Sequence, residues 1–157
     1  MTLEVNVEHR LEDFELKASF VSYAPITALF GRSGAGKTSL VHIIAGLLAP
    51  THGRIVIDGR AQFDEKRGIN LPPRKRRIHY IFQEGRLFPH LTVRQNLMCG
   101  RRFAPARGPY VDGDQIVQLL AMERLLSCRP AKLSGGEKQR VTIGRALLAC
   151  PRLLLID

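Results

Sequence analysis

The fold of this chain is decided by one short stretch, Gly31-Arg32-Ser33-Gly34-Ala35-Gly36-Lys37-Thr38. It fits the pattern G-x-x-x-x-G-K-[ST], in which glycines let the backbone curl so that successive N–H groups point toward a bound phosphate. The lysine of the pattern reaches the β- and γ-phosphates as a mobile charge, and the hydroxyl ligates Mg²⁺. A chance glycine turn is the competing interpretation, so the flanking sequence has to decide.

The residues on either side of the loop predict the strand and helix that a phosphate loop requires. Ile26–Phe30 is a compact apolar run bounded by proline and glycine, which is typical of a strand buried on both faces. Downstream, apolar residues recur at helical spacing between Leu40 and Leu48, so we expect a helix from near Gly36 to about Pro50. This order of strand, loop and helix strongly favours nucleotide binding over a chance turn.

The remainder of the chain predicts further strands and helices. Alternating apolar residues indicate two N-terminal strands that pair antiparallel, and Asp58-Gly59 suits the tight turn of a hairpin. Ser134 and Glu137 have the spacing of a helix capping box. The expected strands lie near 3–7, 14–20, 54–57, 60–63, 78–82 and 153–156, and the expected helices at 115–126 and from 134 to before Pro151. Strands that alternate with helices predict an α/β fold with a largely parallel core sheet.

Composition rules out several classes of protein. The longest apolar run, Ile43–Ala49, is far below the roughly 20 residues that a membrane-spanning helix needs. Residues 1–14 mix charged and apolar side chains, so no signal-peptide core is expected there. Three widely spaced cysteines without a C-x-x-C pair, and five scattered histidines, favour a reduced cytosolic chain without a dedicated transition-metal site.

The chain is strongly basic, which raises the question of a nucleic-acid partner. Its 24 Lys+Arg against 14 Asp+Glu give a formal net charge of +10, and Arg74–Arg77 is a continuous basic cluster. Aromatic residues make up only 6% of the chain and tryptophan is absent, so little is available to stack on bases. A solvated basic face is therefore the favoured interpretation of the cluster.

A second glycine-rich motif carries a family resemblance. The stretch LSGGEKQR, which contains Ser134, Gly135, Gly136 and Glu137, resembles the signature motif of ATP-binding-cassette (ABC) ATPases. The resemblance implies a P-loop NTPase fold, in which the ABC-type nucleotide-binding domain combines a mostly parallel core sheet with an N-terminal antiparallel β subdomain and an inserted helical subdomain. In that family the signature motif contacts the ATP held by a second subunit, so a head-to-tail dimer is implied.

The same resemblance assigns roles to residues that mean little alone. Gln83 matches the Q-loop glutamine, and Asp157 matches the Walker B aspartate. Together with Thr38 they would hold the Mg²⁺ that accompanies ATP, while Lys37 and Gln83 serve catalysis. The family's general-base glutamate and its switch histidine are not present in the chain, so we expect an N-terminal fragment that is inactive alone. The adenine-stacking aromatic is not placed; Phe14 is a weak candidate, for which a core role is favoured.

By this resemblance the chain is one partial ABC ATP-binding domain in three parts. These are the antiparallel β part with the phosphate-loop core (1–82), the Q-loop with the helical lobe (83–132), and the signature helix with the Walker B strand (133–157). The phosphate loop, the stretch Gly68–Pro73 and the stretch Arg86–Arg94 are most similar to the ATPase subunits of bacterial molybdate importers. Departures from the family pattern are His79, where a small residue is usual, and the segment 101–107.

The importer resemblance implies partners and a location. Two integral membrane permease subunits would bind the dimer at the cytoplasmic face of the bacterial inner membrane, and a periplasmic binding protein would supply the substrate. Importers of sulfate, iron, polyamines or sugars remain alternatives. A DNA-repair-type ABC ATPase is less favoured, because the chain between Lys37 and Ser134 has no room for a long coiled coil. A nucleotide-binding module that does not hydrolyse ATP also stays open.

Overall fold

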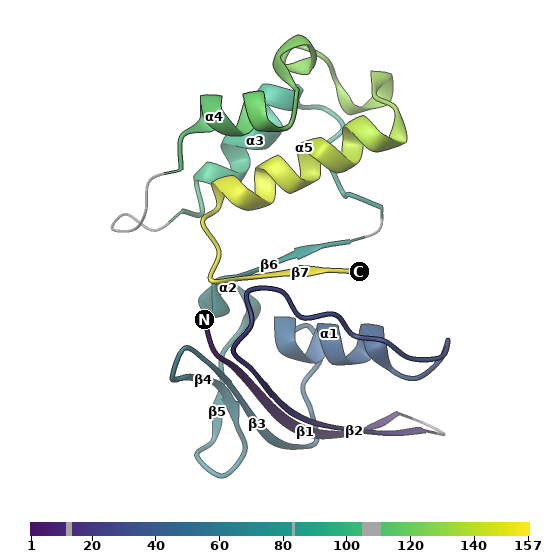
Figure 1. The fold of residues 1–157 in the computed structure, drawn as a ribbon, viewed down its shortest axis with the longest axis vertical. Helices are drawn as coiled ribbons and strands as arrows, with labels where there is room; N and C mark the ends of the chain where they lie inside the picture. The colour runs from purple at the N-terminus through teal and green to yellow at the C-terminus, as the bar shows by residue number, and fades with distance from the viewer. Residues whose placement is uncertain (12–13, 83, 105–110) are drawn as a thin grey trace. The chain divides into compact units, whose positions relative to one another are not determined.

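The chain has two compact units, Met1–Ile78 and His79–Asp157. The computed structural model describes all residues except 12–13, 83 and 105–110 (Figure 1). At 11 and 14 it describes the backbone but not the side chain. The predicted Q-loop glutamine, Gln83, therefore lies outside the described residues, as does the side chain of Phe14. No helix in the described part of the chain combines the length and the apolar character needed to span a membrane.

The first unit contains an antiparallel sheet of five strands, as predicted for the N-terminal part. The strands are β1 (Leu3–Leu11), β2 (Phe14–Ser22), β3 (His52–Ile57), β4 (Arg60–Asp64) and β5 (Ile69–Asn70), in the order β2-β1-β3-β4-β5. Alternate residues of β1 are buried, because a pleated strand points successive side chains to opposite faces. Asp58 and Gly59, which join β3 to β4, both have positive φ (47° and 73°), which confirms the predicted tight turn.

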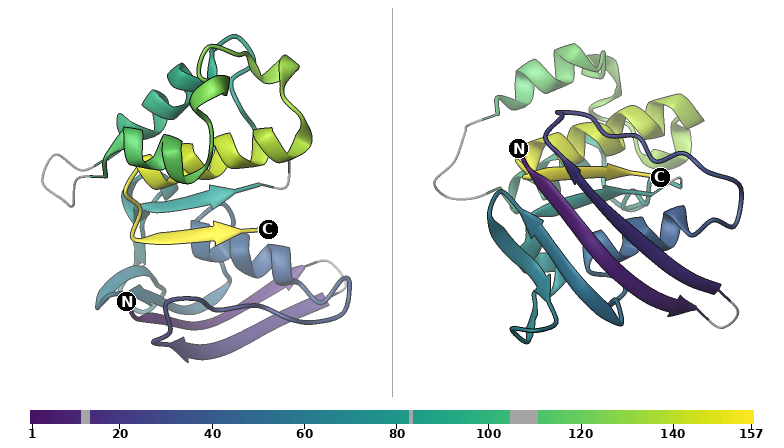
Figure 2. Two further views of the ribbon diagram at one scale, coloured as in Figure 1. Left: turned by 45° about the horizontal axis from the view of Figure 1, so that its top comes forward. Right: turned by 60° about the horizontal axis from the view of Figure 1, so that its bottom comes forward.

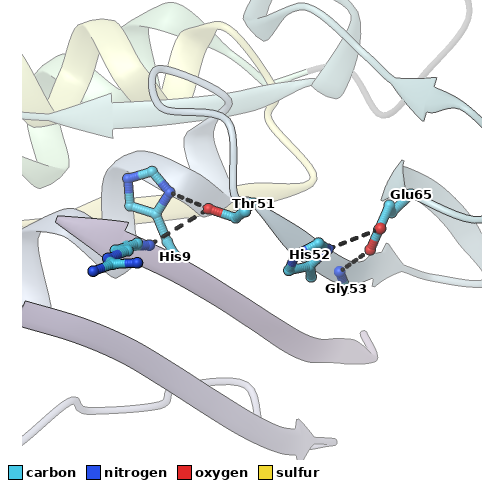
Figure 3. A network of polar contacts seen from close by, with 6 residues as sticks. His9, Thr51, His52, Gly53 and Glu65 are labelled. Atoms are coloured by element: carbon cyan, nitrogen blue, oxygen red, sulfur yellow. Dashed lines mark hydrogen bonds and ion pairs between the residues drawn. The ribbon is translucent and has the colours of Figure 1, made fainter.

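The start of β3 is held by close backbone packing and by polar contacts (Figure 3). Gly53 has φ 113°, and a Cβ there would overlap the backbone of Asn6 on β1, so only glycine fits. Beside it, the His52 Nδ1 and Glu65 Oε1 atoms lie 2.8 Å apart, and the Gly53 N–H donates to Glu65 Oε2 at 3.1 Å. These contacts tie the end of β4 to the start of β3.

Helix α1 (Lys37–Ala45) follows the phosphate loop and lies on one face of the antiparallel sheet (Figures 1 and 2). It ends earlier than the expected Pro50, because Gly46 adopts a left-handed conformation (φ 80°) and its N–H turns back to Ile43 O. The predicted strand at Ile26–Phe30 is wrong: this segment is irregular, and Phe30 is 92% exposed. A strand requires a hydrogen-bonded neighbour, and none of the described strands pairs with this segment.

The second unit combines two strands with helices. The predicted strands near 78–82 and 153–156 are confirmed as β6 (Ile78–Ile81) and β7 (Leu153–Ile156), which pair and run in the same direction (Figure 1). The helices are α3 (Val93–Arg101), α4 (Gly113–Leu119) and α5 (Gly135–Leu148), with short 3₁₀ turns at Glu123–Leu125 and Pro130–Lys132 between α4 and α5. Apolar residues from all three helices share one core, with members Val93, Leu97, Ile116, Val117, Met122, Leu133, Val141 and Leu148.

The helical lobe differs from expectation in its details. Helix α3 was not predicted as an element, although Thr92 and Gln95 form a complete capping box at its start. Helix α4 ends at Leu119, so the expected helix to Leu126 is too long; Ala121 has φ 49°, which breaks the helical path. Another short element that was not predicted, α2 (Pro73–Arg76), lies in the first unit before β6.

Candidate nucleotide-binding site

The phosphate loop curls as its glycines predict. Gly34 and Gly36 have φ values of 79° and 81°, a region that other residues enter only with strain. The Ala35 N–H donates to Arg32 O at 3.2 Å, which closes a turn within the loop. Gly31 to Ala35 are exposed, so the backbone of this turn is accessible to a ligand.

The loop leads directly into the N-terminus of α1, where backbone N–H groups converge. Gly36 is the N-cap and has no side chain to accept from these groups, and the first turn carries no acidic residue. The first N–H groups of a helix lack partners within the helix, and the helix dipole adds positive potential there. Because no carboxylate of the first turn neutralises that potential, this end of α1 is suited to an anion such as phosphate.

The Lys37 side chain folds back over the loop. Its Nζ donates to the carbonyl oxygens of Gly31 and Arg32, each at 2.8 Å. The ammonium group is thereby held above the same backbone that would surround a phosphate. The contact of Lys37 with the β- and γ-phosphates, which the motif predicts, stays a prediction.

The predicted capping box at the start of α5 is confirmed. The Ser134 hydroxyl and the Ser134 N–H each donate to Glu137 Oε2 at 2.7 Å, and the Glu137 N–H returns to Ser134 Oγ at 3.4 Å. The hydroxyl bond, followed by the backbone bond, lowers the pKa of Glu137. The carboxylate is therefore ionised at neutral pH and occupied in fixing the turn.

The two glycines between these residues face open space. A Cβ built on Gly135 or Gly136 would meet nothing within 4 Å. Glycine costs roughly 0.5–1 kcal/mol relative to alanine inside a helix, and nothing in the described chain requires it here. A ligand or partner that approaches this backbone closely would explain why glycine stands at both positions.

The segment that follows Gln83 is anchored to the middle of α5. Arg145 donates to Gly85 O at 3.1 Å and to Arg86 O at 3.0 Å, and the Thr142 hydroxyl donates to Gly85 O at 3.1 Å. Gly85 and Arg86 both have positive φ (68° and 40°), so their carbonyls turn toward the helix. Burial lowers the pKa of Arg145, but a guanidinium remains charged at neutral pH. These anchoring residues escaped sequence reasoning, because the contacts join positions far apart in the chain.

The carboxylate at the end of β7 is oriented by a tyrosine. The Tyr80 hydroxyl on β6 donates to Asp157 Oδ2 at 2.8 Å. Burial, and then this bond, raises the pKa of Tyr80 to about 12, so the hydroxyl stays protonated and acts as a donor. His79, the neighbour that departs from the family pattern, is half-buried; burial and then the charge of Arg145 lower its pKa, which favours a neutral ring.

The predicted site residues thus fall into the two units. The whole phosphate loop lies together in the first, whereas the signature residues and Asp157 lie in the second. Among the residues that the structure describes, no three His, Cys, Asp or Glu side chains gather into a metal-binding cluster.

The comparisons with curated proteins give high identity over the whole chain. The chain is 57% identical to the molybdenum import ATP-binding protein ModC of Rhodospirillum rubrum, over 99% of this chain and 42% of that protein. It is also 57% identical to ModC of Rhizobium etli, over 100% of this chain and 44% of that protein. The chain therefore spans less than half the length of these curated relatives.

Solved structures and a family model lead to the same group of proteins. An ATP-binding subunit of an ABC transporter matches with a TM-score of 0.77 and 27% identity, covering 100% of this chain and 66% of that chain. An ATP-binding cassette in a dimeric post-hydrolysis state with ADP and phosphate matches with a TM-score of 0.69 and 26% identity, covering 100% and 73%. The family model described as ABC transporter matches residues 18–157, and the chain accordingly belongs to the ABC transporter family.

Proposed function

We propose that the chain is the nucleotide-binding part of an ABC importer ATPase that uses ATP hydrolysis to take up molybdate. The observation that carries the ATPase part is the phosphate loop, whose exposed, curled backbone leads into a helix N-terminus without acidic neighbours. The importer and its substrate are supported by the 57% identity to the two ModC proteins.

Each part of the loop has a role in binding the triphosphate. The backbone N–H groups of 31–38 surround the phosphates, while Lys37 exchanges its carbonyl partners for the β- and γ-phosphates. Both interactions neutralise charge that shifts during phosphoryl transfer, which is the main catalytic requirement of this reaction. Lys37 and Gln83 are accordingly our candidates for catalytic roles.

The oxygen donors assigned to the metal fit Mg²⁺. Thr38, Gln83 and Asp157 offer a hydroxyl, an amide oxygen and a carboxylate, the hard ligands that Mg²⁺ prefers beside phosphates. The metal would supply charge neutralisation at the β- and γ-phosphate oxygens. Tyr80 contributes by fixing one oxygen of Asp157 through its 2.8 Å hydrogen bond.

The signature residues 134–137 are proposed to contact the nucleotide of a second copy in a head-to-tail dimer. The open space at Gly135 and Gly136 supports this role, because a phosphate could approach the N-terminus of α5 without a clash. The matched cassette in a post-hydrolysis state is itself dimeric. We further propose two permease subunits as partners at the cytoplasmic face of the inner membrane, with a periplasmic binding protein delivering the substrate.

Calorimetric titration of Mg·ATP tests the nucleotide-binding part. We expect Lys37→Ala to weaken binding at least about tenfold, because it removes a charge that contacts two phosphates. Lys66→Ala, an exposed lysine of the same unit, is the matched control and should bind as the unaltered chain does. Equal affinities for the chain and its Lys37→Ala variant would contradict the proposal.

The substrate requires a separate experiment with the full-length protein, its permease and its binding protein in vesicles. We expect molybdate-loaded binding protein to stimulate ATP hydrolysis. Stimulation by sulfate, iron, polyamine or sugar instead would overturn the substrate while leaving the ATPase assignment intact.

A further inference from the structure

We propose that Arg76 is a positioning residue for ATP binding: it fixes the C-terminal end of α1 and thereby sets the direction of the phosphate loop at the other end. This inference rests on the proposed nucleotide-binding function. Its basis is a buried guanidinium that the mechanism above does not use.

Arg76 has four hydrogen bonds, although it is only 1% exposed. Its Nη1 donates to the carbonyl oxygens of Ile43 and Ile44, each at 2.9 Å, in the last turn of α1. Its Nε donates to Leu71 O at 2.8 Å, and its Nη2 donates to Asn70 Oδ1 at 3.1 Å. One rigid, planar group therefore joins the end of α1 to the last residue of β5 and the residue that follows it.

The positive charge of Arg76 is compensated by the C-terminal end of α1 rather than by a carboxylate. Among the described residues no carboxylate lies within ion-pair distance of Arg76. Burial lowers its pKa to about 10, so the guanidinium remains charged at neutral pH. Its charge is compensated by the negative end of the helix dipole and by the carbonyl oxygens of Ile43 and Ile44 in the last turn of α1. Burying a cation is costly, so four directed hydrogen bonds are needed to hold it.

Gly46 makes room for this arrangement. It ends α1 in a left-handed conformation, and a Cβ there would lie 2.5 Å from Arg76 Nε and 2.7 Å from Arg76 Cζ. The guanidinium thus packs against a backbone that has no side chain. Gly46 and Arg76 form an interlocking pair, since any larger residue at 46 would push the guanidinium off its carbonyl partners.

The length of α1 makes this contact matter at the phosphate loop. A helix of nine residues is about 13 Å long at 1.5 Å per residue. A tilt of about 5° at one end therefore displaces the other end by about 1 Å, a misplacement large enough to weaken a preorganised site. By holding the last turn to the segment 70–71, Arg76 limits that tilt.

The test compares Mg·ATP affinity in full-length protein with Arg76→Met, Arg76→Lys, Asn70→Ala and the control Arg74→Met. Arg74 lies on the same short helix but is exposed, so its variant loses the same charge without losing these contacts. We expect Arg76→Met to weaken binding per folded molecule about tenfold, Arg76→Lys to restore part of the affinity, and Asn70→Ala to weaken it about twofold. The ³¹P resonance of the bound β-phosphate should shift in Arg76→Met and stay in place in Arg74→Met.

A purely structural Arg76 would give a different result. Lower thermal stability with unchanged affinity and unchanged ³¹P resonance in the Arg76 variants would overturn the proposal. If Arg76→Met does not fold, Arg76→Lys and Asn70→Ala decide, and unchanged affinity in both overturns it. If the unaltered protein does not bind Mg·ATP, the failure belongs to the proposed function.

Discussion

Gly100 and Gly136 both lie within helices, yet their surroundings differ. A Cβ on Gly100 of α3 would overlap the backbone carbonyl of Arg145 on α5, whereas a Cβ on Gly136 would meet nothing within 4 Å. The first glycine is required by packing inside the chain. Nothing in the described part of the chain packs against the second, which leaves room for a ligand or partner to approach its backbone.

This contrast predicts opposite effects of the same substitution. Gly100→Ala should lower the free energy of unfolding by about 2 kcal/mol, because overpacking forces the two helices apart. Gly136→Ala should leave it unchanged or raise it by up to about 1 kcal/mol, while ATP hydrolysis by the full-length protein is lost. Urea denaturation and a phosphate-release assay measure the two quantities. Destabilisation by Gly136→Ala would show that this glycine serves the fold.

The His52–Glu65 pair predicts a pH-dependent stability. The hydrogen bond to Glu65, and then its charge, raises the pKa of His52 above 6.5. The hydrogen bond to His52, and then the Gly53 N–H, lowers the pKa of Glu65 below 4.5. The histidine contribution is complete below pH 6.5 and is lost as pH rises through the raised pKa; the glutamate contribution is complete above pH 4.5 and is lost as pH falls through the lowered pKa.

The pair should therefore stabilise the fold most between about pH 4.5 and 6.5. Thermal unfolding of the chain and of His52→Gln across pH 4 to 8 should differ most in this window. His42→Gln, which alters a histidine of α1, is the comparison. A constant difference across the whole pH range would exclude the pair as its source.

At the scale of elements, local signals were predictable and distant ones were not. The capping box of α5 and the turn at Asp58-Gly59 depend on residues within three positions of each other, and both are confirmed. The predicted strand at Ile26–Phe30 failed, because its apolar pattern says nothing about which strand would pair with it. The contacts of Arg76 and Arg145 escaped prediction for the same reason: each joins segments distant in sequence. The phosphate loop was found because its motif is contiguous.

The hydrogen bonds from Arg145 on α5 predict how the segment 84–88 responds to mutation. Arg145→Met removes the donors to Gly85 O and Arg86 O, so amide hydrogen exchange in 84–88 should accelerate more than in α1. We expect a loss of roughly 2 kcal/mol in unfolding free energy, since hydrogen bonds from a charged group are lost. Thr142→Val, which removes a single neutral donor to Gly85 O, should have a smaller effect in the same segment. Uniform acceleration throughout the chain would instead indicate global destabilisation.

At the scale of the whole molecule, the proposed head-to-tail dimer predicts that protection from amide exchange depends on protein concentration. Mg·ATP should slow amide exchange in 31–40 at any protein concentration, because the loop belongs to the same chain as its nucleotide. Exchange in 134–138 should slow only at concentrations where two copies associate. Lys37→Ala should abolish both effects. Protection of 134–138 at high dilution would mean that the signature residues contact the nucleotide of their own chain.

The lysine of the phosphate loop has a thermodynamic consequence. Because the Lys37 ammonium already donates to two carbonyl oxygens, nucleotide binding is an exchange of acceptors rather than the capture of an anion by an unpaired cation. The new contacts join two charged groups and replace contacts to neutral carbonyls, so Lys37 contributes to the affinity only the difference between the two sets. Without nucleotide, two loop carbonyls thus hold the Lys37 ammonium, and the phosphates of a nucleotide would replace them as stronger acceptors.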